Sequence, residues 1–230
     1  GMRVVADTQS PVYPTNVDAT CGRCHADAAR MTRADGTKIP ATVVADYRAS
    51  VHHDALTKGH DLSAPTCNDC HGNHGAAPPG VDAVANVCGT CHAVFAARFA
   101  GSPHQPVFEK ACVECHGNHA VKRPNDALVG TAEGAICATC HADKDDAGYK
   151  GAAAMRGAFD GLSAHIANAE ALVERARNAG MEVGDQHLAI AKARDQLMLA
   201  RTDLHAFDPK KVLADTAEGD KAAAEAEAGG

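Results

Sequence analysis

All ten cysteines of this 230-residue chain lie in pairs with two residues between them, and a histidine directly follows each pair. The five Cys-x-x-Cys-His units occupy residues 21–25, 67–71, 88–92, 112–116 and 137–141. Two thiols at this spacing match the two vinyl groups of a haem, to which they can add, and the adjacent histidine is then placed under the iron. The pattern predicts five covalently bound c-type haems.

The predicted attachment residues are Cys21, Cys24, Cys67, Cys70, Cys88, Cys91, Cys112, Cys115, Cys137 and Cys140. The predicted proximal iron ligands are His25, His71, His92, His116 and His141. Paired cysteines also occur in zinc sites and disulfides. A histidine adjacent to its own pair is badly placed to complete a zinc tetrahedron, and five identical units leave no cysteine over. Haem attachment is therefore the favoured interpretation.

The short chain between the motifs limits how each haem can be covered. Residues 21–141 carry all five units, which leaves about 24 residues per haem, and the chain has no Trp, three Tyr and five Phe. These residues cannot wrap each macrocycle in its own apolar pocket. We expect the haems to pack against one another as the core of a mainly α fold with much irregular structure.

Nine histidines remain as candidates for the sixth position of each iron. The unit Cys-His-Gly-Asn-His occurs twice, and its last residues are His74 and His119. A histidine three residues after a proximal ligand cannot fold back across its own macrocycle. Both are therefore predicted to be distal ligands of neighbouring haems.

A second repeated unit, aromatic-x-x-Ser-x-His, occurs at residues 47–52 and 99–104. Each copy precedes a Cys-x-x-Cys-His-Gly-Asn-His segment, so the two regions resemble copies of one haem-binding module. His52 and His104 are the matching distal candidates.

The fifth distal ligand should come from His165, His187 or His205, or else one iron is left open. His205 is favoured, because it follows a predicted helix where a chain reversal could bring it to the last haem.

The C-terminal third lacks cysteine and is rich in helix formers. Steps of three and four residues mark one apolar stripe at Met155, Phe159, Leu162, Ile166, Ala169, Val173 and Ala176. A second stripe follows at Ile190, Ala193, Leu197, Ala200 and Leu204. With Gly180 as the stop and Asp185 as the next N-cap, these predict an antiparallel helical hairpin.

We therefore expect three parts: a pentahaem domain over 1–147, the hairpin over 148–208, and a flexible, low-complexity tail over 209–230. The hairpin is expected to pack on the haem domain or on a partner subunit, because two Ala-rich helices bury little apolar area alone.

Charge and hydropathy narrow the function further. The net charge of −7 argues against a nucleic-acid partner, and no apolar run is long enough to span a membrane. The first residues lack the apolar segment of an export signal, so we expect that any such signal has been removed.

These motifs resemble the multihaem cytochromes c of respiratory bacteria and archaea, a superfamily that includes tetrahaem quinol dehydrogenases and pentahaem nitrite reductases. The resemblance, which covers residues 21–141, implies low-potential bis-histidine haems and a periplasmic or extracellular location. The Cys-x-x-Cys-Lys unit of the nitrite reductases and the membrane anchor of the quinol dehydrogenases are absent from this sequence. Neither activity is therefore carried over.

The predicted function is electron transfer in extracytoplasmic respiration, without catalysis. Its expected partners are redox proteins, either other cytochromes or a membrane quinol oxidoreductase. Two alternatives stay open: a reductase of nitrogen or sulfur oxyanions at one five-coordinate haem, and a subunit of a conductive filament. The C-terminal helices could also mediate homo-oligomerisation.

Overall fold

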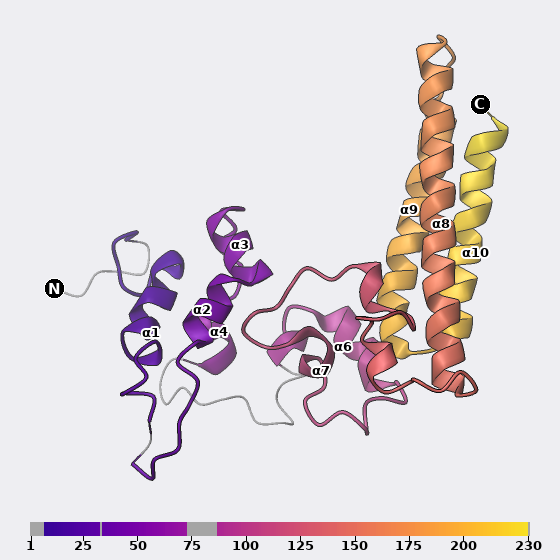
Figure 1. Ribbon diagram of the computed structural model, residues 1–230. Helices are drawn as coiled ribbons and strands as arrows, with labels where there is room; N and C mark the ends of the chain where they lie inside the picture. The colour runs from indigo at the N-terminus through magenta and orange to yellow at the C-terminus, as the bar shows by residue number, and fades with distance from the viewer. Residues whose placement is uncertain (1–6, 33, 73–86, 230) are drawn as a thin grey trace. The chain divides into compact units, whose positions relative to one another are not determined.

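The computed structural model describes residues 7–32, 34–72 and 87–229 (Figure 1). These residues are mainly helical and contain no β-strand, only an isolated bridge between Thr32 and Lys38. Contacts divide the chain into two compact units, residues 1–91 with 109–124 and residues 92–108 with 125–230. The predicted boundary at residue 147 stays a prediction, but the second unit joins the last haem motif to the C-terminal helices.

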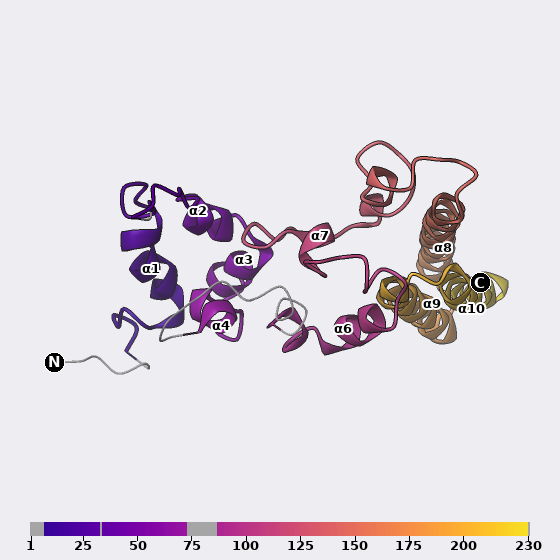
Figure 2. The ribbon, with the colours of Figure 1, turned by 90° about the horizontal axis from the view of Figure 1, so that it is seen from below.

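The first unit is built from short helices (Figure 2). They are η1 (Pro14–Asn16), α1 (Val17–His25), α2 (Val43–Arg48), α3 (Val51–Thr57), α4 (Cys67–His71) and α7 (Val113–His116). An ion pair between Arg48 and Asp18, 2.5 Å long, ties α2 to α1. Helices of this length are marginal alone, so their stability must come from what they pack against.

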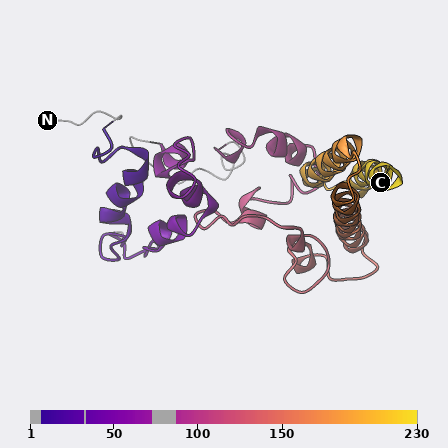
Figure 3. The same ribbon diagram turned by 90° about the horizontal axis from the view of Figure 1, so that it is seen from above.

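The second unit contains the long helices. Its elements are α6 (Ala93–Ala100), η2 (Asp126–Leu128), η3 (Cys137–Thr139), α8 (Ala147–Asn178), α9 (Gly184–Asp203), η4 (Leu204–Ala206) and α10 (Pro209–Ala228). Helices α8, α9 and α10 lie side by side as a three-helix bundle, with successive helices antiparallel (Figures 1 and 3). None of the helices in the described ranges is long and apolar enough to cross a membrane.

The apolar stripes read from the sequence lie in the core of this bundle. Every predicted stripe residue of α8 is buried, as are Ile190, Ala193, Leu197 and Ala200 of α9, while Leu204 is partly buried against the same cluster. Helix α8 ends before Gly180, whose φ of 86° is the left-handed conformation that glycine adopts easily. Helix α9 begins two residues earlier than expected, with Val183 rather than Asp185 at its N-cap.

The segment expected to be a flexible tail instead forms α10, so the C-terminal helices are a bundle of three rather than a hairpin. Asp208 caps α10 by accepting the N–H of Lys210 at 3.0 Å, and Pro209 occupies the first helical position. Ala222, Ala223 and Ala226 are fully buried against the other helices. Small side chains let α10 approach closely, because a Cβ added at Gly219 would lie 2.6 Å from a methyl group of Leu162.

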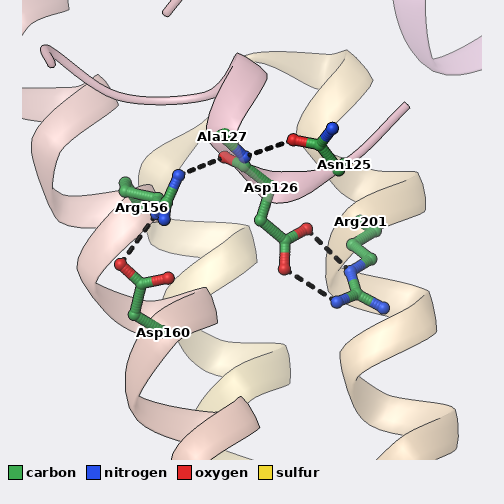
Figure 4. Close-up of polar contacts among 6 residues, drawn as sticks. All are labelled: Asn125, Asp126, Ala127, Arg156, Asp160 and Arg201. Carbon is green, nitrogen blue, oxygen red and sulfur yellow. Dashed lines mark hydrogen bonds and ion pairs between the residues drawn. The ribbon is translucent and has the colours of Figure 1, made fainter. Parts of the chain in front are cut away.

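Ion pairs attach the neighbouring segments to the bundle. Asp126 in η2 accepts two hydrogen bonds from Arg201 of α9, at 2.9 and 2.7 Å, and its carbonyl accepts one from Arg156 of α8 at 2.7 Å (Figure 4). Buried Asp203 of α9 pairs with Arg98 of α6 at 2.5 Å and with Lys211 of α10 at 2.9 Å. The bundle thus holds the segments that flank the third and fifth motifs.

Candidate haem sites

Four of the five Cys-x-x-Cys-His units are folded as single helical turns within or beside the short elements. The first motif ends α1, the second forms α4, the fourth forms α7 with Cys112 as its N-cap residue, and the fifth begins with η3. The histidine N–H bonds to the carbonyl of the first cysteine in two of them, His116 to Cys112 at 3.0 Å and His141 to Cys137 at 2.9 Å. A turn of this kind places residues three and four apart on one face, which presents thiols and imidazole to one ligand.

In the third Cys-x-x-Cys-His motif, Cys88 lies in a helical turn and His92 is the N-cap residue of α6. Helix capping also shapes the second motif, where Asp69 accepts hydrogen bonds from the N–H and the hydroxyl of Thr66 at 2.7 and 2.9 Å. These contacts make Thr66 the N-cap residue and fix the start of α4 at Cys67.

Thiols of successive motifs lie next to one another in the first unit. Burial and the neighbouring Cys21 thiol raise the pKa of Cys67 to about 12. A hydrogen bond with Cys112 raises the pKa of Cys88. These contacts bring the first attachment site beside the second, and the third beside the fourth.

The two Ser-x-His segments share a backbone turn. In each, the serine N–H bonds to the carbonyl of the aromatic residue three positions earlier, Ser50 to Tyr47 and Ser102 to Phe99, both at 2.9 Å. All four of these residues are buried. After the turn the copies diverge, because Ser50 caps α3, which contains His52, whereas His104 lies in a non-helical turn.

Two imidazoles lie close together in the compact unit formed by residues 1–91 and 109–124. The ring centroids of His71 and His119 are 5.9 Å apart and their planes differ by 20°. Burial, followed by the charge of His71, lowers the pKa of His119. A lowered pKa favours the neutral imidazole, which is the form that binds metals.

A second pair lies in the second unit. The rings of His104 and His141 are 6.0 Å apart, with planes at 89°. Phe207 and Phe108 pack on His104 at centroid distances of 4.1 and 5.2 Å. Burial among these rings, and then the neighbouring His141, lowers the pKa of His104.

Asp146 forms a hydrogen bond with the His141 ring. Its carboxylate lies 2.5 Å from His141 Nδ1, and this hydrogen bond is the main reason why the pKa of Asp146 is lowered. With Nδ1 engaged, Nε2 is the nitrogen left to bind iron. Sequence reasoning missed Asp146, although an aspartate before a helical run is a recognisable N-cap signal.

The remaining distal candidates are placed differently. His205 lies in η4 with its ring 5.0 Å from that of Phe95, which in turn is 6.2 Å from His92. The structure therefore puts His205 near His92, the histidine of the third motif, and puts His104 beside His141, the histidine of the fifth. His52 lies in the first turn of α3. The predicted ligand His74 falls outside the described residues.

The two histidine pairs can be tested for their fit to a shared iron. An imidazole nitrogen binds a transition metal at about 2.0–2.1 Å, so two rings on opposite sides of one metal have centroids about 6.3 Å apart. The observed 5.9 and 6.0 Å are close to that separation. Moreover, His104 Nδ1 is buried with no hydrogen-bond partner among the described residues. The donors present fit bis-histidine haem.

Comparison with known proteins finds the family described as the doubled CXXCH motif, which matches residues 104–146. The matched range contains the fourth and fifth attachment units, the His104–His141 pair and Asp146. The match supports a multihaem c-type cytochrome-like protein, and it indicates haem c binding and electron transfer at a general level. No curated protein and no solved structure matches the chain.

Proposed function

We propose that the chain carries electrons through five covalently bound haems, each with an iron held by two histidines. The observation that carries this proposal is the two pairs of neighbouring imidazoles, with ring centroids 5.9 and 6.0 Å apart, each of which joins a motif histidine to a histidine from another segment. Each bound haem would supply an iron that alternates between the ferric and ferrous states.

The protein would hold His71 and His119 on one iron, and His141 and His104 on another. Two ligands that stay in place in both redox states keep the rearrangement on electron transfer small and leave no position for a substrate. The lowered pKa values of His104 and His119 support this assignment, because they favour the neutral imidazole that binds metals. His205, His52 and His74 are the proposed ligands of the other three irons.

The close packing of neighbouring motifs supports relay between haems. Cys21 interacts with Cys67, and Cys88 with Cys112, so the macrocycles at these sites would be neighbours. Haem propionates add negative charge to the formal −7 of the chain. A redox partner with a basic patch would therefore be favoured. We place this exchange outside the cytoplasm, as the thioether-bound haems of similar proteins are.

Single histidine variants of the haem-loaded protein test the ligand assignment. His119→Ala and His104→Ala should each convert one haem from low-spin to high-spin ferric iron, read by absorption and electron paramagnetic resonance (EPR) spectra. His187→Ala is the matched control, since this histidine is exposed on α9 and should change nothing. Intact mass would confirm that each variant carries all its haems. If both variants remain wholly low-spin with five haems, the proposed ligand pairs are wrong.

A further inference from the structure

The start of α8 is built around the proximal histidine of the fifth site. Asp146 is the N-cap residue and accepts the N–H of Tyr149 at 3.1 Å, and the same carboxylate oxygen contacts His141 Nδ1 at 2.5 Å. One carboxylate thus joins the imidazole to a 32-residue helix whose buried side is packed into the bundle.

Gly148 leaves space for the same imidazole. A Cβ at this position would lie 2.1 Å from both Cε1 and Nδ1 of His141, which is far inside contact distance. By contrast, a Cβ at Gly157 of the same helix would meet nothing within 4 Å. The ring of His141 therefore rests directly on the first turn of α8, where only glycine permits it.

The hydrogen bond to Asp146 has a chemical consequence for an iron bound to Nε2. A carboxylate that accepts from the other ring nitrogen fixes the tautomer and raises the basicity of the ligand. A more basic ligand stabilises ferric over ferrous iron, and hydrogen bonding around axial ligands is one of the means by which proteins tune haem potentials.

The ring planes distinguish the two histidine pairs. The planes of His71 and His119 are 20° apart, whereas those of His104 and His141 are 89° apart. Two imidazole ligands with parallel planes donate π density to the same iron d orbital and separate its energy from that of the second d orbital of π symmetry. Perpendicular imidazole planes leave the energies of these two d orbitals almost equal. Low-spin ferric haem of the second kind gives an EPR signal with an unusually large principal g value.

We propose that Asp146 is a positioning residue that fixes His141 perpendicular to His104 and lowers the reduction potential of the haem bound at Cys137 and Cys140. This inference rests on the proposed function, because it requires His141 and His104 to bind one iron. The carboxylate acts through the imidazole, and Gly148 provides the space in which the ring is held.

Asp146→Asn separates the charge from the geometry. Asparagine is an equally good N-cap and its oxygen can still accept from Nδ1, so α8 and the ring plane should be kept. In the five-haem protein we expect the large-g signal to persist while one of the five reduction potentials rises, as measured by spectroelectrochemical titration. Asp145→Asn is the matched control. It removes the same charge from the neighbouring residue, whose side chain is 98% exposed. It should shift that potential much less.

Gly148→Ala alters the geometry without altering the charge. The added methyl group must displace the imidazole or the first turn of α8, so the large-g signal should move or disappear. Gly157→Ala is its control and should leave the spectrum unchanged. The His104→Ala variant should abolish the large-g signal and leave the signal from the His71–His119 haem.

The outcomes separate the two proposals. If Asp146→Asn shifts no potential more than Asp145→Asn does, or if Gly148→Ala keeps the large-g signal intact, the positioning role is overturned while the ligation stands. If His104→Ala retains the large-g signal, the ligand pair itself is wrong, and the positioning role fails with it.

Discussion

The C-terminal bundle and the helices α1–α4 are held together by different means. The bundle has a continuous apolar core that includes Phe159, Leu162, Val173 and Val212, all less than 2% exposed. Helices α1–α4 have at most nine residues each, and bury only separate apolar side chains such as Val44 and Leu56. The bundle therefore has an apolar core made of its own side chains, and we propose that helices α1–α4 depend instead on the thioether bonds and the macrocycles.

The strongest test of this difference compares the chain with and without haem. In the haem-free chain, the amides of α8–α10 should stay protected from hydrogen exchange, while those of α1–α4 should exchange as in an unfolded peptide. Covalent haem should restore protection to α1–α4. Equal protection of both regions in the haem-free chain would show that α1–α4 do not depend on bound haem.

Phe159→Ala should weaken the bundle selectively. Phe159 is 0% exposed, and truncation of a buried aromatic side chain costs about 3–5 kcal/mol of unfolding free energy. Urea unfolding followed by circular dichroism should show this loss for the helical transition, with the low-spin haem spectrum unchanged. Leu188→Ala is the control, because Leu188 is 71% exposed and its loss should cost less than about 0.5 kcal/mol. Equal losses for both variants would exclude a packed core at Phe159.

The apolar stripes of α8 and α9 could be predicted from the sequence because their period of three to four residues follows from helix geometry and does not depend on how the helices pack. Helix α10 could not be recognised in this way, since Val212 is the one larger apolar residue on its buried face, which otherwise consists of alanine, Gly219 and Thr216. Alanine and glutamate are strong helix formers, however, so propensity argued for a helix where low complexity was read as disorder.

Asp203→Asn should loosen the connection between α6 and the bundle. Arg98 and Lys211 both pair with this buried carboxylate and remain more than a third exposed, so we expect a loss of about 1–2 kcal/mol. Burial raises the pKa of Asp203, but the two cations outweigh it and the pKa is lowered overall. Nearby Asp215 has its pKa raised by burial and by Asp203.

The sign of the pH dependence follows from that lowered pKa. The stabilisation by Asp203 should be complete above the ordinary aspartate pKa of about 3.9 and should disappear as the pH falls through the lower folded value. Urea unfolding of wild type and Asp203→Asn should therefore converge in acid. Asp195→Asn, an exposed change on the same helix, should show no such convergence. A constant difference between wild type and Asp203→Asn at all pH values would refute this role of the carboxylate.

The pair between Arg201 and Asp126 should contribute least. Both side chains are partly exposed, at 38% and 22%, so a double-mutant cycle with Arg201→Ala and Asp126→Asn should give a coupling of about 0.5–1 kcal/mol. The bond from Arg156 to the Asp126 carbonyl is unaffected by either change. A coupling near zero would mean that η2 is held on the bundle by packing and by Arg156 alone.

At the haem sites, sequence and structure supply different information. The attachment residues can be predicted because the chemistry fixes their spacing, and repeated units identify His104 and His119 as ligand candidates. The pairing of these residues depends on the path of the chain between motifs, which spacing does not determine. Asp146 and Gly148 were missed because their role arises from the closeness of His141 to α8, a contact without a sequence motif.

EPR spectroscopy of the fully oxidised holoprotein reports directly whether each iron is held by two histidines, as we propose. We expect low-spin ferric signals only, among them a large-g species from the His104–His141 haem and a rhombic species from the His71–His119 haem. A high-spin ferric signal amounting to a whole haem would contradict this proposal, and would favour a five-coordinate iron that is open to substrate.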